Sequence, residues 1–434
     1  MALSFYGLLV NLTFLFGLFN PIPNRNIIIL KPSGDSLMTG LIQKAVDDCE
    51  SRGGGAVRFA KGEYHSGTIL LKSNVRLHLK RNAIIKGSDK YSDYRNDAFF
   101  YGKDLNNVEI TGRGSIDGVD CYNPRGEEGF RGPHCIRLIN CEGIKLEGFT
   151  IKNAANWAIN CRNCSGGNVT NVTIRGGHDG LHTRFCKNFI VKKCDFRTGD
   201  DAFAGNDNQD FFISDCLINT SCNGFRLGCL NLKVQRCKLW GPGEYMHKIQ
   251  KRNNMLSAFV HFSPPDEKPT LKSGNWIIKD VTVENVDHFY MYNYKKGLWQ
   301  TGKPVTSVSF ENIDAKDILN AFYISGDTGR LFNMNLIKCK FSFRDDSEYI
   351  GKSFEGARLE SDYFFHAENF NRISLSNVDF TKKNSSVILD CLSGNSIAMK
   401  SVRFNTGSQM TPYFLENTKE TELSHMRLNG SKIN

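Results

Sequence analysis

The feature that most constrains this chain is a repeat of about 22 residues in its middle. Each repeat ends in a short stretch of alternating apolar residues, and the stretches end at Ile151, Ile174, Phe196, Ile218 and Leu239. The steps between these ends are 23, 22, 22 and 21 residues. Short strands and Gly/Asn turns at so regular a spacing are typical of a solenoid, whose units bury their apolar faces by stacking. The repeat therefore predicts an all-β solenoid with one coil per repeat.

Carboxylates and amides recur at one point of this repeat. The fifth residue after each strand end is, in order, Asn156, Asp179, Asp201, Asn223 and Glu244. Equivalent positions on stacked coils would lie about 4.8 Å apart, like residues on neighbouring strands of a sheet. The chemistry-bearing side chains of this register are therefore predicted to meet on one flank of the solenoid.

The strand pattern continues on both sides of the central repeats without a Pro/Gly/Ser-rich linker. We therefore expect one domain over residues 25–434, because a solenoid grows in one dimension and escapes the usual limit on domain length. Residues 39–51 are the clear helical exception. Gly53–Gly55 follow this segment, and its expected apolar face contains Leu41, Ile42, Ala45, Val46 and Cys49. Such a helix is suited to covering the open N-terminal end of the core.

Residues 1–24 carry no charge, and residues 5–19 are mostly apolar. This run is too short to span a bilayer and resembles the apolar region of a secretion signal. We therefore predict an export segment at 1–24, a secreted or periplasmic location and no membrane span.

The net charge of +10 favours a polyanionic partner. No Arg/Lys-rich run interleaved with aromatic residues appears, so nucleic acid is disfavoured as that partner. An acidic polysaccharide or oligosaccharide remains, and we expect the protein to act on it as a monomer.

The 14 cysteines would suggest disulfides in an exported protein. Their spacing argues against this, because Cys194, Cys216 and Cys237 follow the repeat, as do Cys164 and Cys186. Cysteines stacked inward act as small apolar side chains, and we predict a mostly reduced ladder. Metal-site spacing of the CxxC…CxxC kind is absent.

Several motifs of residues 33–240 together resemble one known family. Gly112–Gly118, Asn156-Trp157, His178-Asp179-Gly180 and Gly199-Asp200-Asp201 are similar to landmarks of the family 28 glycoside hydrolases, the polygalacturonase-like enzymes. The resemblance implies a right-handed, single-stranded parallel β-helix of the pectin-lyase-like kind with an N-terminal capping helix. It also implies hydrolysis of a pectic, galacturonate-containing substrate without a cofactor or metal ion. Carried over by position, it makes Asp200 the general acid and Asp179 with Asp201 the pair that holds the attacking water.

The chemistry agrees with this assignment. Inverting hydrolysis needs one protonated acid for the leaving oxygen and one carboxylate for the water. Repulsion among clustered carboxylates raises the proton affinity of at least one of them. Asp179 and Asp201 share a register, whereas Asp200 is offset by one residue. The competing interpretation is that these acids form solvated turns, because Asp-Gly and Gly-Asp are common turn dipeptides.

Two departures from the family concern the substrate. Cys222-Asn223-Gly224 stands where the family has Gly-His-Gly, and the following Arg-Ile-Lys motif has no clean counterpart. Asn223 is equally compatible with a ligand contact and with a structural Asn ladder. We predict that the substrate is bound by Asn156, Trp157, His178, Asn223, Arg226, His247 and Lys248. The alternative for the cations of this set is that they form a solvated basic face.

The spacing between coils widens after Leu239, because the next strand end is expected at Val283, 44 residues on, with no recognisable strand midway. Long loops on a rigid scaffold are often binding walls or lids. We predict that residues 240–272 close one end of the cleft, which would give action at chain ends.

Two other functions remain open. A polysaccharide lyase on the same fold would use Arg226 or Lys248 as base and calcium held by Asp200, Asp201 and Asp207. A non-catalytic carbohydrate-binding β-helix is suggested by the missing His.

Overall fold

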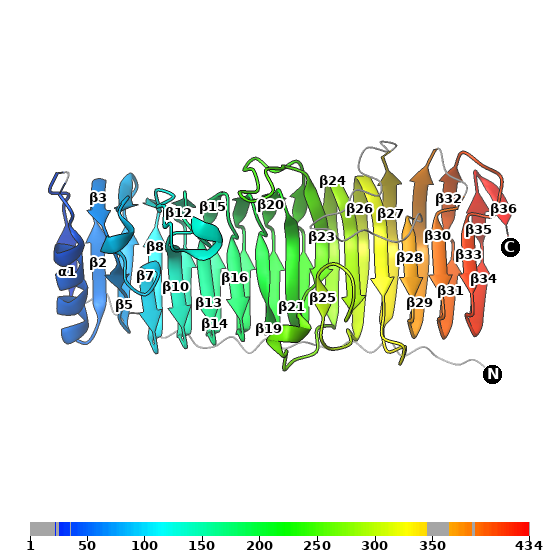
Figure 1. Cartoon of the computed structure of the whole chain (residues 1–434), viewed down its shortest axis with the longest axis horizontal. Coiled ribbons are helices and arrows are strands. Elements are labelled where there is room, and N and C mark those ends of the chain that lie inside the picture. The colour runs from blue at the N-terminus through cyan, green and yellow to red at the C-terminus, as the bar shows by residue number, and fades with distance from the viewer. Residues whose placement is uncertain (1–21, 23–25, 35, 345–363, 384–386, 434) are drawn as a thin grey trace.

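The computed structural model describes residues 22, 26–34, 36–344, 364–383 and 387–433, and most of these lie in strands or in turns between strands. Figure 1 shows the strands side by side along one long axis, with α1 at the N-terminal end of the stack. Strand pairing within the described residues is parallel apart from the antiparallel β35–β36 pair and an isolated antiparallel bridge between Arg95 and Ala98. The predicted parallel β-helix is confirmed.

Three stacks of strands run the length of the β-helix. The first contains β1 (Ile27–Leu30), β2 (Gly55–Phe59), β5 (Val75–Leu79), β8 (Asn106–Gly112), β11 (Glu142–Glu147), β14 (Ser165–Thr170), β17 (Lys187–Lys192), β27 (Asn333–Phe343), β29 (Arg372–Lys382), β31 (Ser396–Lys400) and β34 (Glu420–Ser424). The second contains β3 (Gly62–Ser66), β6 (Ala83–Gly87), β9 (Ser115–Asp117), β12 (Thr150–Lys152), β15 (Thr173–Gly176), β18 (Asp195–Thr198), β20 (Leu217–Thr220), β22 (Lys238–Trp240), β32 (Arg403–Thr406), β35 (Met426–Leu428) and β36 (Ser431–Ile433).

The third stack positions the site. It contains β4 (Ile69–Leu70), β7 (Ala98–Lys103), β10 (His134–Ile139), β13 (Ile159–Arg162), β16 (Leu181–Arg184), β23 (Met255–His261), β28 (Phe365–Glu368), β30 (Leu389–Leu392) and β33 (Tyr413–Glu416). The longest strands run through more than one stack. β27 and β29 continue from the first stack into the second, and the other long strands are β19 (Phe203–Ser214), β21 (Asn223–Gln235), β24 (Trp276–Tyr294) and β26 (Ser307–Ser325). The remaining short elements are β25 (Gln300–Thr301) and the 3₁₀ turns η1 (Tyr91–Asp93), η2 (Glu127–Gly129) and η3 (Pro265–Glu267).

The repeat inferred from the sequence is the register of the second stack. Ile151 pairs with Ile174, Ile174 with Phe196, Phe196 with Ile218, and Ile218 with Leu239. All five side chains are buried, and full burial of one such side chain contributes about 1.5–3 kcal/mol. The stacking of these apolar positions therefore holds the coils in register.

An aromatic ladder continues this core beneath the third stack. The rings of Phe203 and Phe225 stack with centroids 4.7 Å apart, and Phe225 and Phe259 follow at 5.1 Å. These rings are buried and face inward, so they support the site from below and are not surfaces for sugar.

The N-terminal helix α1 (Thr39–Ser51) forms where the sequence predicts it, and it packs against β1, β2, β4 and β5. Ile42, Ala45, Val46 and Cys49 are buried, but Leu41 is 56% exposed, so its expected place on the apolar face is wrong. Ile42 and Ala45 already fill the core-facing side of that turn, which leaves the neighbouring position facing solvent.

The expectation of no strand between Leu239 and Val283 is also wrong. Leu239 pairs directly with Val283, so residues 240–282 make up one enlarged coil. Its third-stack strand is β23, which pairs with β21 through Asn223–Ser257 and Phe225–Phe259. The strand is buried on both faces, so its sequence lacks the alternation that marks a half-buried strand.

All 14 cysteines are buried and unpaired, and the reduced ladder remains a prediction. No helix within the described residues is long and apolar enough to cross a membrane. The predicted export segment, residues 1–24, lies outside the described residues except for Ile22.

Candidate active site

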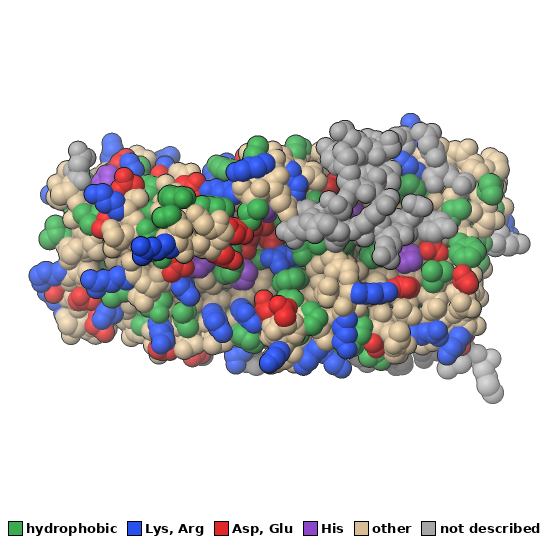
Figure 2. All heavy atoms as spheres, in the orientation of Figure 1, with side chains coloured by type: hydrophobic (Ala, Val, Ile, Leu, Met, Phe, Trp, Pro, Cys, Tyr) green, Lys and Arg blue, Asp and Glu red, His purple; other side chains and the backbone are tan. Residues whose placement is uncertain are grey.

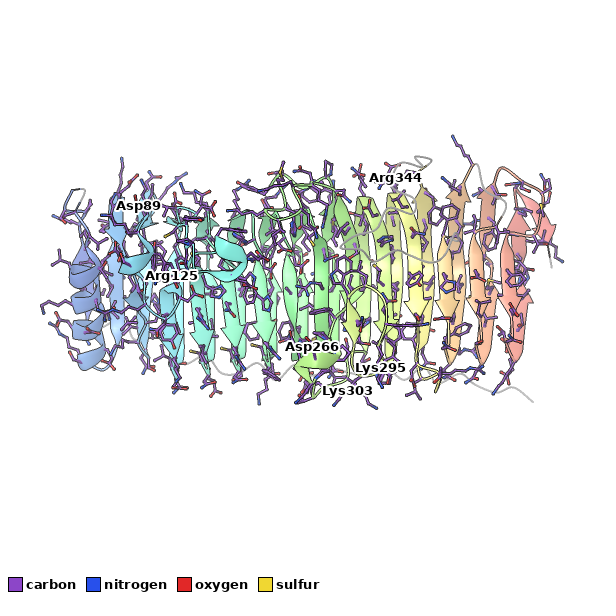
Figure 3. The ribbon with its side chains drawn as sticks, in the orientation of Figure 1. Asp89, Arg125, Asp266, Lys295, Lys303 and Arg344 are labelled. Carbon is purple, nitrogen blue, oxygen red and sulfur yellow. The ribbon has the colours of Figure 1, made fainter. Side chains whose placement is uncertain are left out.

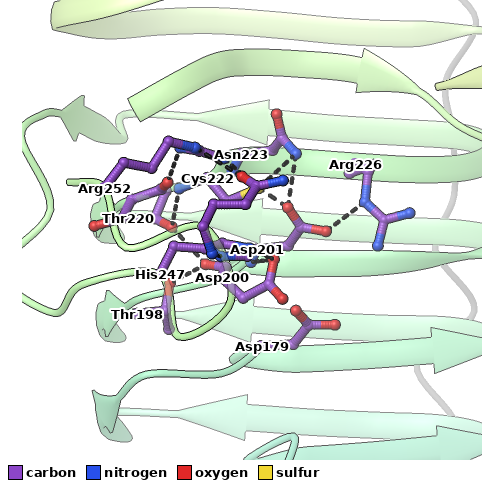
Figure 4. A network of polar contacts seen from close by, with 12 residues as sticks. Asp179, Thr198, Asp200, Asp201, Thr220, Cys222, Asn223, Arg226, His247 and Arg252 are labelled. Atoms are coloured by element: carbon purple, nitrogen blue, oxygen red, sulfur yellow. Dashed lines mark hydrogen bonds and ion pairs between the residues drawn. The ribbon is translucent and has the colours of Figure 1, made fainter. Parts of the chain in front are cut away.

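Three acids lie where second-stack strands turn into third-stack strands on consecutive coils. Asp179 stands between β15 and β16, and Asp200 and Asp201 stand between β18 and β19. One carboxylate oxygen from each acid lies within 4.8 Å of the others (Figure 4). The predicted meeting of residues 179, 200 and 201 therefore occurs in the structure, and we call these residues the acid trio.

Glycine makes this close approach possible. A Cβ on Gly199 would lie 2.5 Å from the carbonyl oxygen of Met246 and 2.7 Å from that of Gly177. Any side chain at Gly199 would push the Asp200–Asp201 turn away from its neighbours, since real Cβ atoms do not approach backbone so closely. The Gly-Asp-Asp order is thus a packing requirement of this corner.

Each member of the trio has a different set of partners. Asp179 Oδ2 and Nδ1 of His182 share a hydrogen bond at 2.9 Å. Asp201 is fully buried, accepts from the backbone N–H (3.2 Å) and Nδ2 (2.7 Å) of Asn223, and is ion-paired with Nε of Arg226.

Asp200 is the most exposed acid of the trio, with 17% of its side chain accessible against 2% for Asp179. His247 Nε2 lies 3.6 Å from one of its oxygens, and Arg131 Nη2 lies 3.7 Å from the other. The hydroxyl groups of Thr198 and Thr220 donate to its backbone carbonyl at 2.7 and 2.5 Å. Asp200 is therefore the carboxylate held in place by its backbone and open to a ligand.

Burial and mutual repulsion separate the proton affinities of the three acids. Burial raises the pKa of Asp179 well above its ordinary value, and the charges of Asp200 and Asp201 raise it further. Burial also raises the pKa of Asp201, against the opposing effect of Arg226. Burial alone would raise the pKa of Asp200, but the contact with His247 and the charges of Arg226 and Arg131 hold it below its ordinary value. Without a sugar, the trio's proton therefore resides on Asp179.

The predicted binding residues divide into two groups. Asn223, Arg226 and His247 contact the trio directly, and Asn156 reaches it through Arg131, whose Nη1 donates to Asn156 Oδ1 at 3.3 Å. Lys248 instead pairs with Asp120.

Trp157 and His178 are engaged with other rings. Trp157 stacks on His182 with centroids 3.5 Å apart and an interplanar angle of 5°, and His134 lies 4.9 Å from its other side. His178 is buried beside Phe130, and burial together with Arg131 and Lys248 lowers its pKa to about 2. Neutral His178 is therefore a packing residue at ordinary pH.

The expected register of the amides needs correction at both ends. Ile159 pairs with Leu181, which aligns Trp157, and not Asn156, with Asp179. Asn223 pairs with Ser257, whose hydroxyl donates to Asn223 Oδ1 at 2.5 Å. Glu244 lies off the register and binds Arg197 at 2.5 Å. Counting five residues past each strand end gave the wrong register at these positions. The first repeat is 23 residues long, which shifts Asn156 by one residue, and the enlarged coil moves Glu244 out of register.

Two residues of the site were missed from the sequence. His182 lies on the outward face of β16, next to Asp179, and the period-2 pattern of that strand could have identified it. Arg131 lies on the segment before β10, outside the repeats that carry the acids, where no periodicity applies. Its pKa is raised by the hydrogen bond to Glu128 and by the carboxylates of Asp179 and Asp200, against the effect of burial.

Two irregular segments flank the site. The first precedes β10 and supplies Arg131, and the second follows β23 and supplies Glu267, which binds Arg184 at 3.0 Å and Asn206 at 2.5 Å. Figure 3 labels Arg125 on the first segment and Asp266 on the second. Figure 2 shows acidic and His side chains gathered in the middle of this face.

Among the residues that the structure describes, two sets of side chains have ligand atoms close enough for a metal ion. They are the acid trio and a second set of Asp200, Cys222 and His247. Arg226 and Arg131 stand within reach of the same carboxylates, and their positive charge opposes a cation there. The calcium set of the lyase alternative is not assembled, because Asp207 instead accepts hydrogen bonds at 2.7 Å from the backbone N–H groups of Thr270 and Leu271.

Comparison with known proteins bears on this site. Residues 49–230 match the family model described as glycosyl hydrolases family 28, and this range includes the acid trio. The resemblance to family 28 is confirmed. A probable polygalacturonase of Vitis vinifera is 24% identical over 208 residues, which span 41% of this chain and 42% of that relative's length.

Solved polygalacturonases share the fold. A polygalacturonase from Erwinia carotovora ssp. carotovora has a TM-score of 0.60 at 16% identity and covers 74% of this chain and 94% of its own. The family 28 exopolygalacturonase of Yersinia enterocolitica has a TM-score of 0.58 at 14% identity over 94% of this chain and 79% of its own. The likeness extends the β-helix comparison well beyond residue 230.

Proposed function

We propose that this protein is a glycoside hydrolase of the polygalacturonase type that cleaves an acidic, galacturonate-containing polysaccharide or oligosaccharide. The observation that carries the proposal is the acid trio, three carboxylates on adjacent coils with oxygens within 4.8 Å of one another. The family 28 match over residues 49–230 supports it. The proposal includes one catalytic domain over residues 25–434, export from the cytoplasm, action as a monomer and a role in pectin degradation.

In the proposed mechanism, Asp200 protonates the leaving glycosidic oxygen while Asp179 and Asp201 hold the attacking water. Exposure supports this choice for Asp200, because the carboxylates of Asp179 and Asp201 are buried behind it. Asp201 is suited to remain ionised beside Arg226 and to accept the proton of the water.

The proton must then move from Asp179 to Asp200 when substrate binds. Arg131 lies 3.7 Å from Asp200 and lowers its pKa. A uronate carboxylate that engages Arg131 would compete for that positive charge and raise the proton affinity of Asp200. An acidic sugar would thereby create the acid that cleaves its own bond, which supports a uronate over a neutral substrate.

We propose inversion at the anomeric carbon, with the water held by two carboxylates as nucleophile. The trio is more compact than the separation of about 6.5–9.5 Å that is usual between the acid and base of inverting enzymes, and about 5–5.5 Å is usual for retaining ones. In our mechanism the third carboxylate accounts for the difference. The water is held by two carboxylates, Asp179 and Asp201, and not by a single base that faces the acid Asp200.

Action at chain ends is part of the proposal. The segment after β23 reaches over the third stack, where Glu267 binds both Arg184 of β16 and Asn206 of β19. Asp207 anchors the same segment through Thr270 and Leu271. A wall fixed at these points would stop a long chain from passing through the cleft. Equal initial release of internal and terminal fragments from a long polymer would rule out this part of the proposal.

The groups that a lyase would need are otherwise engaged. Arg226 is ion-paired with Asp201, and the surrounding carboxylates raise its pKa despite burial, so it is a poor base. Lys248 is paired with Asp120. A hydrolase is therefore the better fit to the contacts of these residues.

The deciding experiment incubates the protein with galacturonate oligosaccharides of defined ends and follows the products by NMR. We expect a saturated product whose first-formed anomer is inverted. A product that absorbs in the ultraviolet would indicate a lyase, and binding without turnover would indicate a carbohydrate-binding protein.

Substitutions separate the roles within the trio. Asp200→Asn should abolish cleavage of the natural linkage but retain a larger fraction of activity on an aryl galacturonide, whose leaving group needs no proton. Asp179→Asn should impair both reactions, and the distant Asp314→Asn is the matched control. Equal losses of Asp200→Asn on both substrates would remove Asp200 from the acid role.

A further inference from the structure

A hollow lies at another corner of the coil, away from the acid trio. It has a volume of about 1150 Å³ and is lined by the ends of β5, β8 and β11 and the turns that follow them. Those turns lead from the first stack to the second, whereas the acids lie between the second and the third. The hollow and the active site are therefore separate.

The floor of the hollow is backbone that comes unusually close together. Gly112 has φ +117°, and a Cβ there would lie 2.0 Å from the carbonyl oxygen of Leu79. Gly148 has φ +87°, and its Cβ would lie 2.6 Å from the carbonyl oxygen of Gly112. Glycines on consecutive coils thus leave the corner without side chains, which hollows it between the flanking residues.

The walls of the hollow are strongly basic. The cationic and titratable side chains among its lining residues are Arg76, His78, Lys80, Arg81, Arg113 and Lys145, against one carboxylate, Glu147. Two of the cations are paired, because Arg76 lies 2.5 Å from Glu109 and Lys145 lies 2.9 Å from Glu147.

Three cations of the hollow remain without a carboxylate. Lys80, Arg81 and Arg113 are exposed, and within the part of the chain that the structure describes none of them forms an ion pair. The pKa of His78 is lowered by burial and by the positive charges of Arg58, Arg76 and Lys80. The electrostatic potential around His78 is therefore positive. The hollow therefore presents unneutralised positive charge over a concave surface.

The spacing of these charges indicates an extended ligand. Lys80 and Arg81 follow β5, Arg113 follows β8, and these strands are neighbours in the stack. Equivalent positions on neighbouring coils lie about 4.8 Å apart, so Lys80 and Arg113 are neighbours along the long axis, and Arg81 lies beside Lys80 on the same coil. A compact anion would meet one or two of them, whereas a strand with repeated carboxylates would meet all three.

We propose that this basic hollow is a second binding site for the polyuronate chain, used to hold a long substrate while its end is cleaved at the acid trio. The proposal deepens the proposed function, on which its choice of ligand rests. The site raises the local concentration of substrate through electrostatic attraction and a second point of attachment. Its effect is confined to substrates long enough to reach both sites.

The test compares two triple variants that lose the same charge. The hollow variant carries Lys80→Gln, Arg81→Gln and Arg113→Gln, and the control carries Lys187→Gln, Lys340→Gln and Lys400→Gln, which are also exposed. Binding of polygalacturonate is measured by calorimetry at low salt in an Asp200→Asn background, so that the polymer is not cut. Cleavage of a galacturonate trimer is measured without that background.

We expect the hollow variant to bind the polymer about tenfold more weakly than the control, with the difference reduced at high salt. Trimer cleavage should be equal in the two variants. Equal polymer affinity of the two variants would overturn the proposal. If no galacturonate is cleaved at all, the proposed function fails, while the binding comparison still decides whether the hollow holds the polymer.

Discussion

The ion pair between Arg226 and Asp201 allows a quantitative prediction. Asp201 is fully buried, and Arg226 keeps only 19% of its side chain exposed. Replacing Arg226 by Met preserves most of the side-chain volume but leaves Asp201 without its cation. Breaking a buried pair from one side costs about 3–5 kcal/mol. We expect a loss of about 3 kcal/mol in the free energy of unfolding at pH 7, at the lower end of that range, because two hydrogen bonds from Asn223 remain on Asp201.

The loss should depend on pH in a defined direction. Burial already raises the pKa of Asp201, and removing the cation raises it further. A carboxyl whose folded pKa lies above its unfolded value of about 3.9 contributes stability that is fully present below that value and lost as pH rises through the folded pKa. The variant should therefore be closest to the wild type near pH 4 and furthest from it at pH 7.

The assay is urea unfolding followed by tryptophan fluorescence at both pH values. Arg403→Met is the matched control, because Arg403 also pairs with an aspartate through its Nε, at 2.5 Å from Asp379, but is 52% exposed. Exposed pairs contribute little, so its loss should be small and nearly independent of pH. A loss in Arg226→Met no larger than the control, or one equal at both pH values, would refute the reasoning.

Three further predictions concern packing, cysteine chemistry and the proton of the trio. Gly205→Ala should lower the free energy of unfolding several-fold more than Gly430→Ala in the same urea assay. Both glycines have positive φ, but a Cβ at Gly205 would lie 1.8 Å from the carbonyl oxygen of Thr183, whereas a Cβ at Gly430 would meet open space. A thiol assay without reductant should count 14 free cysteines after unfolding and almost none before, and a smaller count in the unfolded protein would reveal disulfides. Arg131→Gln should move the alkaline limb of the pH–rate profile to higher pH. Arg131 lowers the pKa values of Asp179 and Asp200, so its loss favours their protonated forms. An unchanged limb would show that Arg131 does not set the pKa of the general acid.

The sequence was most informative where one side chain per coil does the same job on every coil. The strand ends from Ile151 to Leu239 are paired as their spacing predicts, because burial of the same position on each coil is what stacks the coils. The nearness of Asp179 and Asp201 follows from that register.

Prediction failed where the chain leaves the repeat. Arg131 and Glu267 come from irregular segments, whose course depends on local contacts and not on a period. The preference of the proton for Asp179 was also beyond the sequence, because it depends on how far each carboxyl is buried and on cations that approach from other coils.

The enlarged coil shows what the loss of a period conceals. β23 is buried on both faces, so its sequence gives no alternation from which to infer a strand. A homogeneous apolar stretch of that kind is compatible with a strand or a helix until its neighbours are known.

Because each coil pairs only with the coils before and after it, the solenoid can change length away from the trio without moving the three acids apart. The three acids lie on two consecutive coils, those of β16 and β19, and Asn223 and Arg226 contact Asp201 from the next coil. An extra coil gained between these coils by duplication would separate the acids, whereas one gained further along would lengthen the solenoid and leave the acids together. Evolution could therefore adjust the reach of such a protein and its reaction independently.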